Sequence, residues 1–198
     1  MGLTATNSGS NFELTPHGVH IARCYRLIDL GTQETEFQGQ KKQQHKVMFA
    51  WELLGDDKME DGRPYSVSKR YTVSLHEKAQ MRKDLEAWRG KAFTPEEEAN
   101  FDLTKICGAF CMLNIVHEVG KNGNEYANIA SIMPLPKGMP KPDGINEIQV
   151  FDIDNPDMEM FNGFGEKLKA TIMAAPEWGQ VKSKSADPFA DFESDVNF

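Results

Sequence analysis

Residues 45–54 and 65–75 alternate apolar and polar side chains, and this alternation restricts the fold more than any other feature of the sequence. Successive side chains of a β-strand point to opposite faces, so a period of two is typical of a strand with one face in a core. The pattern therefore predicts two half-buried strands, with Lys46 and Arg70 facing outward. The apolar faces carry Val47, Phe49, Trp51 and Leu53, then Val67, Tyr71 and Val73, while Met48, Ala50 and Glu52 share the parity of Lys46.

Strand patterns recur before and after these two segments. The first strand, residues 17–31, changes the parity of its apolar positions, which indicates a bend or a bulge. A polar loop is predicted at residues 32–44. Residues 108–119 and 125–135 are predicted to pair through the tight turn GKNGN. Beyond a hinge rich in Pro and Gly, residues 146–153 contain one more candidate strand.

Helical patterns occur between the third and fourth strands and near the C-terminus. The first helix is predicted to start at Ser74 and Glu77, which have the spacing of a capping box, and to end at Gly90. A short helical turn is predicted to begin at Thr94 and Pro95. The residues at helical spacing are Met81, Leu85 and Trp88 in the first helix, and Phe161, Phe164, Leu168 and Ile172 in a single C-terminal helix.

The order of elements is three strands, a helix and two strands, followed by an appendage. An OB-fold has the same order: five strands form a barrel, and the helix between strands three and four closes one end. We therefore expect a mainly β protein, an OB barrel with a C-terminal helical appendage and a disordered tail. The expected parts are a flexible lead (1–16), the DNA-binding barrel (17–138), an extension with one helix (139–180) and an acidic tail (181–198).

The segment SADPFADFESDVNF, residues 185–198, combines four acids with three phenylalanines and contains no Lys or Arg. Low aliphatic content and uniform negative charge are typical of a disordered segment. The acids contribute half of the net charge of −8, so the acidity of the whole chain does not exclude a basic groove on the body. Solubility does not explain the rings, and we expect a partner to bind Asp187, Phe189, Asp191, Phe192, Glu193, Asp195 and Phe198.

Single-stranded nucleic acid is bound by cations that follow the phosphates and by aromatic rings on which bases stack. In an OB-fold, strands two and three and the adjoining loops form that face. Some assignments stay open: Tyr71 alternates with Val73 as a core residue would, and Lys46 and Arg70 also fit an ordinary solvated strand face. The candidates are Arg23, Tyr25, Arg26, Phe37, Lys41, Lys42, His45, Lys46, Lys69, Arg70, Tyr71, Lys121 and Tyr126.

Metal and catalytic sites have weaker support. Cys107 and Cys111 lie four residues apart on a predicted strand, about 13 Å, which is too far for two ligands of one zinc ion. The three cysteines therefore predict reduced thiols, and we expect no metal and no cofactor.

The acids of PDMEM near Lys167 have the residue types of a metal nuclease, but solvated loop acids explain them better. No phosphate-binding loop or hydrolase motif is found, so we expect a protein without catalytic activity.

The tail ending in Phe198, after a body of three strands, a helix and two strands, resembles the single-stranded DNA-binding proteins of bacteria and of bacteriophages, those of phage replication in particular. The resemblance extends to HGVHIARCYRLIDLGTQ, KVMFAWELL and CMLNIVHEVGKNGNEYANIASIMPLPKG, within residues 17–138. It implies an OB-fold, sequence-independent binding of single strands, and docking of the tail onto replication or recombination proteins. The tail departs from the bacterial pattern, because Val196 and Asn197 precede Phe198 in place of a denser acidic run with Pro.

We therefore expect sequence-independent binding and protection of single-stranded DNA in phage replication or recombination. The expected partners are single-stranded DNA and, through the tail, replication or recombination proteins; a homo-oligomer stays open. Neither a secretory signal nor a membrane span is predicted, so we expect the protein in the cytoplasm, that of the host if a phage encodes it. Two alternatives remain: a phage accessory or recombination-mediator module whose barrel binds peptide, and a metal-dependent nuclease.

Overall fold

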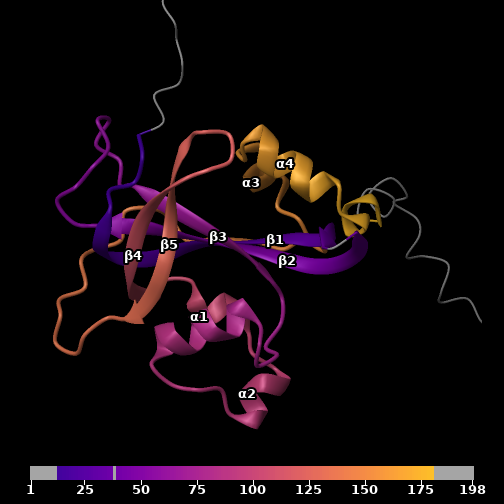
Figure 1. Ribbon diagram of the computed structural model, residues 1–198, viewed down its shortest axis with the longest axis horizontal. Coiled ribbons are helices and arrows are strands. Elements are labelled where there is room, and N and C mark those ends of the chain that lie inside the picture. The colour runs from indigo at the N-terminus through magenta and orange to yellow at the C-terminus, as the bar shows by residue number, and fades with distance from the viewer. Residues whose placement is uncertain (1–12, 38, 181–198) are drawn as a thin grey trace, which may run out of the picture.

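The alternating segments form strands of one sheet (Figure 1). The strands are β1 (Gly18–Phe37), β2 (Gln40–Leu54), β3 (Ser66–Thr72), β4 (Phe110–Val119), β5 (Glu125–Pro134) and β6 (Gln149–Phe151). The computed structural model describes residues 13–37 and 39–180. Neighbouring strands follow the order β3-β2-β1-β4-β5 with antiparallel pairing, and β6 adds a parallel pairing to β1. The protein is therefore mainly β, as the alternation predicts.

Irregularities in β1 let this strand pair with three others. Its register against β2 shifts twice, which confirms the bend or bulge expected from the change of parity. Residues 18–23 pair with β4, and residues 26–28 pair with β6. The shifts lie between Cys24 and Arg26 and between Asp29 and Gly31.

Gly31, at the second shift, is a point inside β1 where the backbone needs a glycine. Its φ is +65°, a left-handed conformation that residues with a Cβ atom rarely adopt. A Cβ atom there would also lie 2.7 Å from side-chain atoms of Ala175 and Ile153. A larger residue would therefore strain the strand and push it away from the C-terminal extension.

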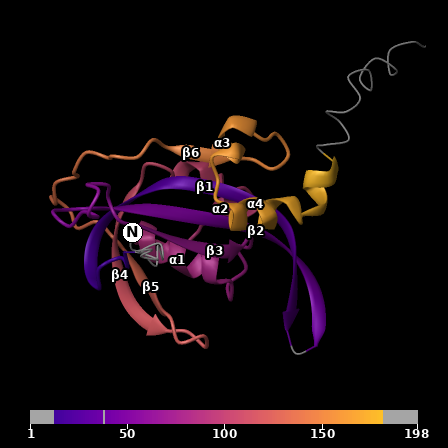
Figure 2. The same cartoon turned by 90° about the horizontal axis from the view of Figure 1, so that it is seen from above.

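Beyond the second shift, β1 and β2 continue as a two-stranded arm that leaves the body (Figure 2). The prediction of a polar loop at residues 32–44 is therefore wrong, because these residues pair from Thr32↔His45 to Phe37↔Gln40. Side chains along the arm are exposed or half-buried, so its strands do not need the apolar alternation that marks a half-buried strand. Across the arm, the Thr35 hydroxyl donates to the Lys42 carbonyl at 3.2 Å.

Helix α1 (Gln80–Arg89) follows β3 and packs its apolar face into the core. It begins later than predicted because Ser74 does not cap it; the Ser74 hydroxyl accepts from the His76 N–H in a local turn. Gly90 ends the helix in the left-handed region, as expected. The next elements are α2 (Pro95–Ala99), which begins after Thr94 as predicted and has a capping box between Thr94 and Glu97, and the 3-10 turn η1 (Leu103–Ile106).

The path of paired strands is open in the part of the chain that the structure describes. β3 and β5, at its two ends, share no backbone ladder, although Cα atoms of the two strands approach within 8 Å. Helix α1 lies against both of them. Its place in the sequence, between the third and fourth strands, is the predicted one.

Two hydrophobic cores lie on opposite faces of β1 and β2. The first core lies between the sheet and α1 and contains the predicted face of β2, including Phe49 and the fully buried Trp51. The second contains Met48 from the other face, so β2 is buried on both faces between Val47 and Leu54. Its other members are Ile28, Leu30, Phe151, Ile153, Phe161, Phe164, Ile172, Ala175 and Trp178.

The C-terminal extension covers this second face as two helices, where a single helix was predicted (Figure 1). α3 (Met158–Asn162) and α4 (Glu166–Met173) are separated by a turn that contains Gly163 and Gly165, and residues 176–180 are helical again. None of the helices within residues 13–37 and 39–180 is long and apolar enough to cross a membrane.

The predicted lead and tail fall mostly outside the described residues. Of the lead, residues 13–16 are described, and they lie against the sheet: the buried Thr15 donates to the Ser66 carbonyl at 3.2 Å, and its own carbonyl lies 2.8 Å from His117 Nε2. The predicted tail, residues 181–198, lies entirely outside them.

Candidate nucleic-acid interface

Four basic side chains, Lys42, Lys46, Arg70 and Lys78, line one groove, which we call the basic groove. The groove has a volume of about 780 Å³ and lies between the base of the arm, β3 and the segment that leads from β3 into α1. Three of the four cations, those of β2 and β3, belong to the predicted set. The fold therefore brings together three of the predicted cations of strands two and three, Lys42, Lys46 and Arg70.

The basic groove is electropositive because its cations are not neutralised. No carboxylate is among the residues that line it. Within the described part of the chain, none of its four cations forms an ion pair. Cations that gather without counter-charges attract an anion, and their field is strengthened where a low-dielectric wall lies behind them.

The register of the sheet shows that two of these cations, Lys46 and Arg70, have no acidic residue opposite them. Lys46 lies opposite Gly31 on β1 and Thr72 on β3, and Arg70 lies opposite Met48 on β2. None of these cross-strand neighbours can neutralise a cation. For Lys46 and Arg70, strand pairing therefore supplies no counter-charge.

Lys69 and Tyr71, both predicted contacts, point away from solvent toward α1. Lys69 Nζ lies 2.6 Å, and the Tyr71 hydroxyl 2.8 Å, from the same Asp84 oxygen. Burial first, and then the Asp84 carboxylate, raise the pKa of Tyr71. Tyr71 lies in the wall of the basic groove but is only 3% exposed, so it is a core residue and not a platform for a base.

Arg23, a third predicted contact, forms a buried ion pair. Its Nε donates to Oε1 of the fully buried Glu52 at 2.6 Å. Glu52 also accepts from the backbone N–H groups of Ile145 and Asn146 at 3.2 and 2.8 Å, and Arg23 reaches the Asn146 carbonyl. This pair, the Arg23–Glu52 latch, holds the segment after β5 onto the sheet and leaves Arg23 little access to a ligand.

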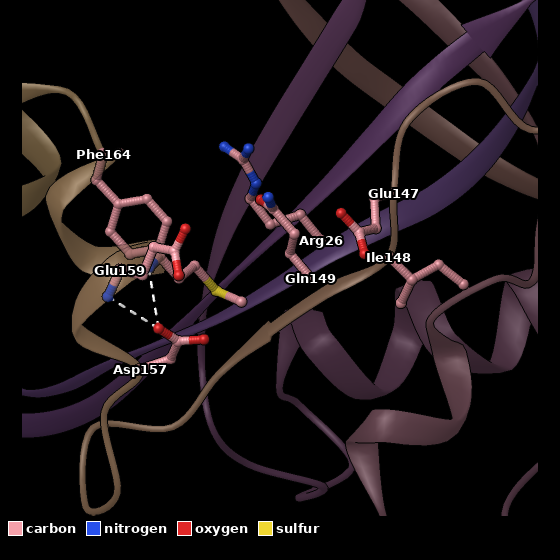
Figure 3. A pocket seen from close by; sticks show the side chains of 9 residues that line it. Arg26, Glu147, Ile148, Gln149, Asp157, Glu159 and Phe164 are labelled. Carbon is pink, nitrogen blue, oxygen red and sulfur yellow. Dashed lines mark hydrogen bonds between the residues drawn. The ribbon is translucent and has the colours of Figure 1, made fainter.

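Tyr25 and Arg26 do not line the basic groove. Tyr25 is 8% exposed and belongs to the core. Arg26 lines a different pocket, of about 440 Å³, in which it lies near the Phe164 ring at 5.9 Å (Figure 3). This pocket also contains Glu147, Asp157 and Glu159, so its carboxylates outnumber its one cation and disfavour a phosphate.

Asp157 and Glu159 are the acids of the PDMEM motif, and the structure gives one of them a local role. Asp157 caps helix α3 by accepting from the backbone N–H groups of Glu159 and Met160 at 2.9 and 3.0 Å (Figure 3). In the described residues, no group of three or more His, Cys, Asp or Glu side chains is arranged to hold a metal ion.

Of the remaining predicted contacts, those with described side chains do not line the basic groove. Lys41 is exposed and pairs with Glu34 at 2.8 Å, and His45 lies 2.7 Å from Asp29. Phe37 ends β1, but its side chain falls outside the described part. Lys121 and Tyr126 are exposed at the β4–β5 turn, where hydrogen bonds from Asn122 and Asn124 lower the pKa of Tyr126.

Two residues of the basic groove were missed from the sequence, His76 and Lys78. Both lie in the segment after β3, which was interpreted as the start of the helix. The structure starts α1 only at Gln80, so these side chains belong to a loop beside β3. The sequence feature that could have identified them is a pair of basic residues close behind a strand already predicted to carry cations.

The three cysteines are free thiols. A hydrogen bond with Cys107 and burial raise the pKa of Cys24, and burial raises the pKa of Cys111. Both buried thiols therefore stay protonated at neutral pH, which makes them weak nucleophiles and weak metal ligands.

Comparison with known proteins does not identify a family for this chain. No family model matches the chain, and a search of the curated proteins found no match. The functional proposal therefore depends on the basic groove and its free cations.

Proposed function

We propose that the protein binds single-stranded DNA in the basic groove, without sequence specificity, and protects it during phage DNA replication or recombination. The observation that carries this proposal is that Lys42, Lys46, Arg70 and Lys78 line one polar groove without a carboxylate among them. Phosphate contacts of this kind supply most of the affinity of sequence-independent binding. The resemblance of the sequence to single-stranded DNA-binding proteins supports the choice of ligand and of process.

In this proposal, Lys46 and Arg70 contact phosphates from neighbouring strands, while Lys42 and Lys78 contact them from the arm and from the loop before α1. The buried ring of Tyr71 contributes shape and not stacking. Binding therefore depends mainly on charge, and the affinity should fall steeply as salt is added, because the counterions released from DNA lose their advantage.

We also propose that the sheet is an OB barrel. Three features support this: the strand order β3-β2-β1-β4-β5, the helix between β3 and β4, and the approach of the two end strands to within 8 Å. The basic groove would then lie on the face formed by strands two and three, where OB-folds bind oligonucleotides.

Titration of the full chain with fluorescent oligo-dT at low salt tests the proposal. We expect binding at micromolar protein or below, similar binding to a mixed-sequence single strand, and weaker binding to a duplex of the same length. No retention of oligo-dT at micromolar protein would contradict the proposal and would favour a peptide-binding module. Magnesium-dependent degradation of the oligonucleotide would instead favour the nuclease.

The segment 185–198, outside the described residues, is proposed to recruit replication or recombination proteins through its acids and phenylalanines. A peptide with this sequence, immobilised, should retain such a protein, and the same peptide with Phe198→Ala should retain less of it. Equal retention by both peptides would contradict a role for the terminal ring.

A further inference from the structure

A second groove without carboxylates, which we call the apolar groove, lies beside helix α1. It consists of two adjoining hollows, of about 360 and 470 Å³, that share Trp88, Ala109 and Phe110. Its walls come from α1, from the start of β4 and from the segment that follows β5 (Figure 1). Only α1 also lines the basic groove, through Gln80 and Met81 at its start, whereas the apolar groove uses Leu85, Trp88 and Arg89 toward its end.

The rim of the apolar groove is cationic. Lys105, Lys137 and Lys141 line it and are exposed, and none of the lining residues is acidic. Within residues 13–37 and 39–180, none of these three lysines forms an ion pair. Arg89, the fourth cation of the lining, is already paired with Glu97. The groove therefore combines apolar walls with uncompensated positive charge at the rim.

The aromatic walls of the apolar groove are not open platforms. Lys141 Nζ lies 5.6 Å from the centre of the Phe110 ring, and the Arg89 guanidinium carbon lies 5.2 Å from the centre of the Phe101 ring. The Trp88 ring is buried, and its N–H donates to the Phe110 carbonyl at 2.9 Å. Because these rings are covered or buried, the groove suits an inserted apolar side chain better than a row of stacked bases.

We propose that the apolar groove binds an acidic peptide that carries phenylalanines, and that its occupant is the segment 185–198 of this same chain. The segment offers both complements: three phenylalanine rings for the hollows and four acids for the lysine rim. Its aspartates and glutamate contact exposed lysines without competition, because the segment contains no base and the groove no acid.

The chain is long enough for this contact. Residues 181–198 follow the last described residue, Gln180, and an extended chain of this length spans about 60 Å at roughly 3.3 Å per residue. A compact body with this number of described residues has a radius of gyration of only about 15 Å. The far end of the segment, with Phe198, therefore reaches across the body without unfolding any of it, whereas residues 181–186 alone span about 20 Å.

This inference goes beyond the proposed function, because it gives the tail a binding place of its own on the body. The tail and DNA then bind different grooves, and the tail does not block the phosphate contacts. A partner protein that takes the tail must displace it from the apolar groove, which makes recruitment a competition between two binding sites.

The inference can be tested without DNA. Isotope-labelled protein ending at Lys184 is titrated with the peptide SADPFADFESDVNF, and the backbone amide shifts are followed by NMR. We expect shifts at residues 105–110 and 134–141, and no shifts at residues 42–46 and 70–80. Shifts confined to the basic groove, or no shifts at millimolar peptide, would overturn the proposal.

Matched variants identify the chemistry. Lys105→Glu with Lys141→Glu should weaken the peptide at least about tenfold, whereas Lys42→Glu with Lys46→Glu, an equal change of charge in the basic groove, should leave its affinity unchanged. All four lysines are exposed or half-buried, so the variants should fold, which their amide spectra will show. A peptide with its three phenylalanines changed to alanine should bind at least about tenfold more weakly, because it keeps the charge but not the rings. Equal binding by that peptide would contradict the inserted rings.

An oligo-dT titration of the same labelled protein completes the test. If its shifts appear at residues 105–110 and 134–141, the apolar groove is a nucleic-acid site and the tail assignment is wrong. If oligo-dT does not bind at all, the proposed function fails, while the peptide result stands by itself.

Discussion

Two groups of cations on the same three strands have opposite environments. Arg23 on β1 lies opposite Glu52 in the sheet register and is neutralised in a buried latch, with a side chain only 14% exposed. Lys46 and Arg70, on β2 and β3, lie opposite Gly31, Thr72 and Met48, and stay free in the basic groove. The difference shows that an acidic partner supplied by the fold, from a neighbouring strand as for Arg23 or from helix α1 as for Lys69, decides whether a strand cation is neutralised or is available to a ligand.

The largest effect is expected when the latch is broken. Arg23→Ala leaves Glu52 buried without its cation, and removing one partner of a buried pair costs about 3 kcal/mol of the free energy of unfolding. The affinity of the folded fraction for oligo-dT should not change. Urea denaturation gives the first quantity and titration at low temperature gives the second.

Arg70→Ala is the matched control for the latch, because it removes the same side chain from an exposed position. It should change the free energy of unfolding by no more than about 0.5 kcal/mol. If Arg23→Ala kept full stability and lost DNA binding, Arg23 would be a ligand contact. The distinction between a structural Arg23 and ligand-binding cations in the groove would then be wrong.

The double variant Lys46→Ala/Arg70→Ala tests the free cations. Losing two phosphate contacts should reduce the slope of log affinity against log salt by about 1.4 for a single strand. Stability should stay close to that of the parent. Anisotropy titrations with oligo-dT at several salt concentrations measure the slope.

Lys41→Ala is the control for that variant, because Lys41 is a cation of the same strand that pairs with Glu34 and does not line the basic groove. Its salt slope should match that of the parent. A larger loss of oligo-dT affinity with Lys41→Ala than with the double variant would indicate that DNA binds on the arm and not in the basic groove.

Deletion of residues 185–198 should have a smaller effect of opposite sign. The deletion removes four negative charges from the chain, so binding to oligo-dT should be preserved or become a few-fold tighter at low salt. A full-length variant with its four tail acids changed to amides should behave in the same way. A marked loss of DNA binding in the truncated protein would contradict the division between body and tail.

The smallest effect concerns a carboxylate on the covered side of the sheet. Glu177 accepts from the hydroxyl and the N–H of Thr32 at 2.5 and 3.1 Å. Burial raises the pKa of Glu177, but these hydrogen bonds outweigh it and hold the pKa below the usual value. A lowered pKa stabilises the fold above the pKa of the unfolded chain, and this contribution is lost as the pH falls through the pKa of the folded state.

The stability difference between the parent and Glu177→Gln should therefore be steady near neutral pH and shrink below about pH 4. Urea denaturation at pH 7 and at pH 3 measures it. Glu166→Gln, on the exposed start of α4, is the control and should show a smaller change. A difference that grows in acid would mean that Glu177 is not held as a carboxylate.

The fold could be predicted where the core imposes a period on the sequence. The inward face of β2, with Phe49 and Trp51, and the stop of α1 at Gly90 were predicted correctly. The arm was predicted as a loop, because a two-stranded ribbon in water leaves no apolar period in its residues 32–44. Local patterns therefore predict buried strands well and exposed ribbons poorly.

The candidate site could be predicted only in part. Lys42, Lys46 and Arg70 were placed together by the expected role of strands two and three, and they share the basic groove. Arg23 and Lys69 have the same local pattern of charge, but their partners, Glu52 and Asp84, are distant in sequence. Which cations are free depends on these partners, and the sequence does not show them.

The sequence by itself determined the inward faces of the strands, because the alternation of side chains is a local property of the backbone. Only the tertiary structure decided the outward face of β2. Met48, Ala50 and Glu52 have the parity of an exposed face, yet all three are buried. Met48 packs with the C-terminal extension and Glu52 binds the segment after β5. The residues that cover this face come from roughly a hundred positions away in the sequence. The local alternation of side chains cannot show which distant segment will exclude water from a strand.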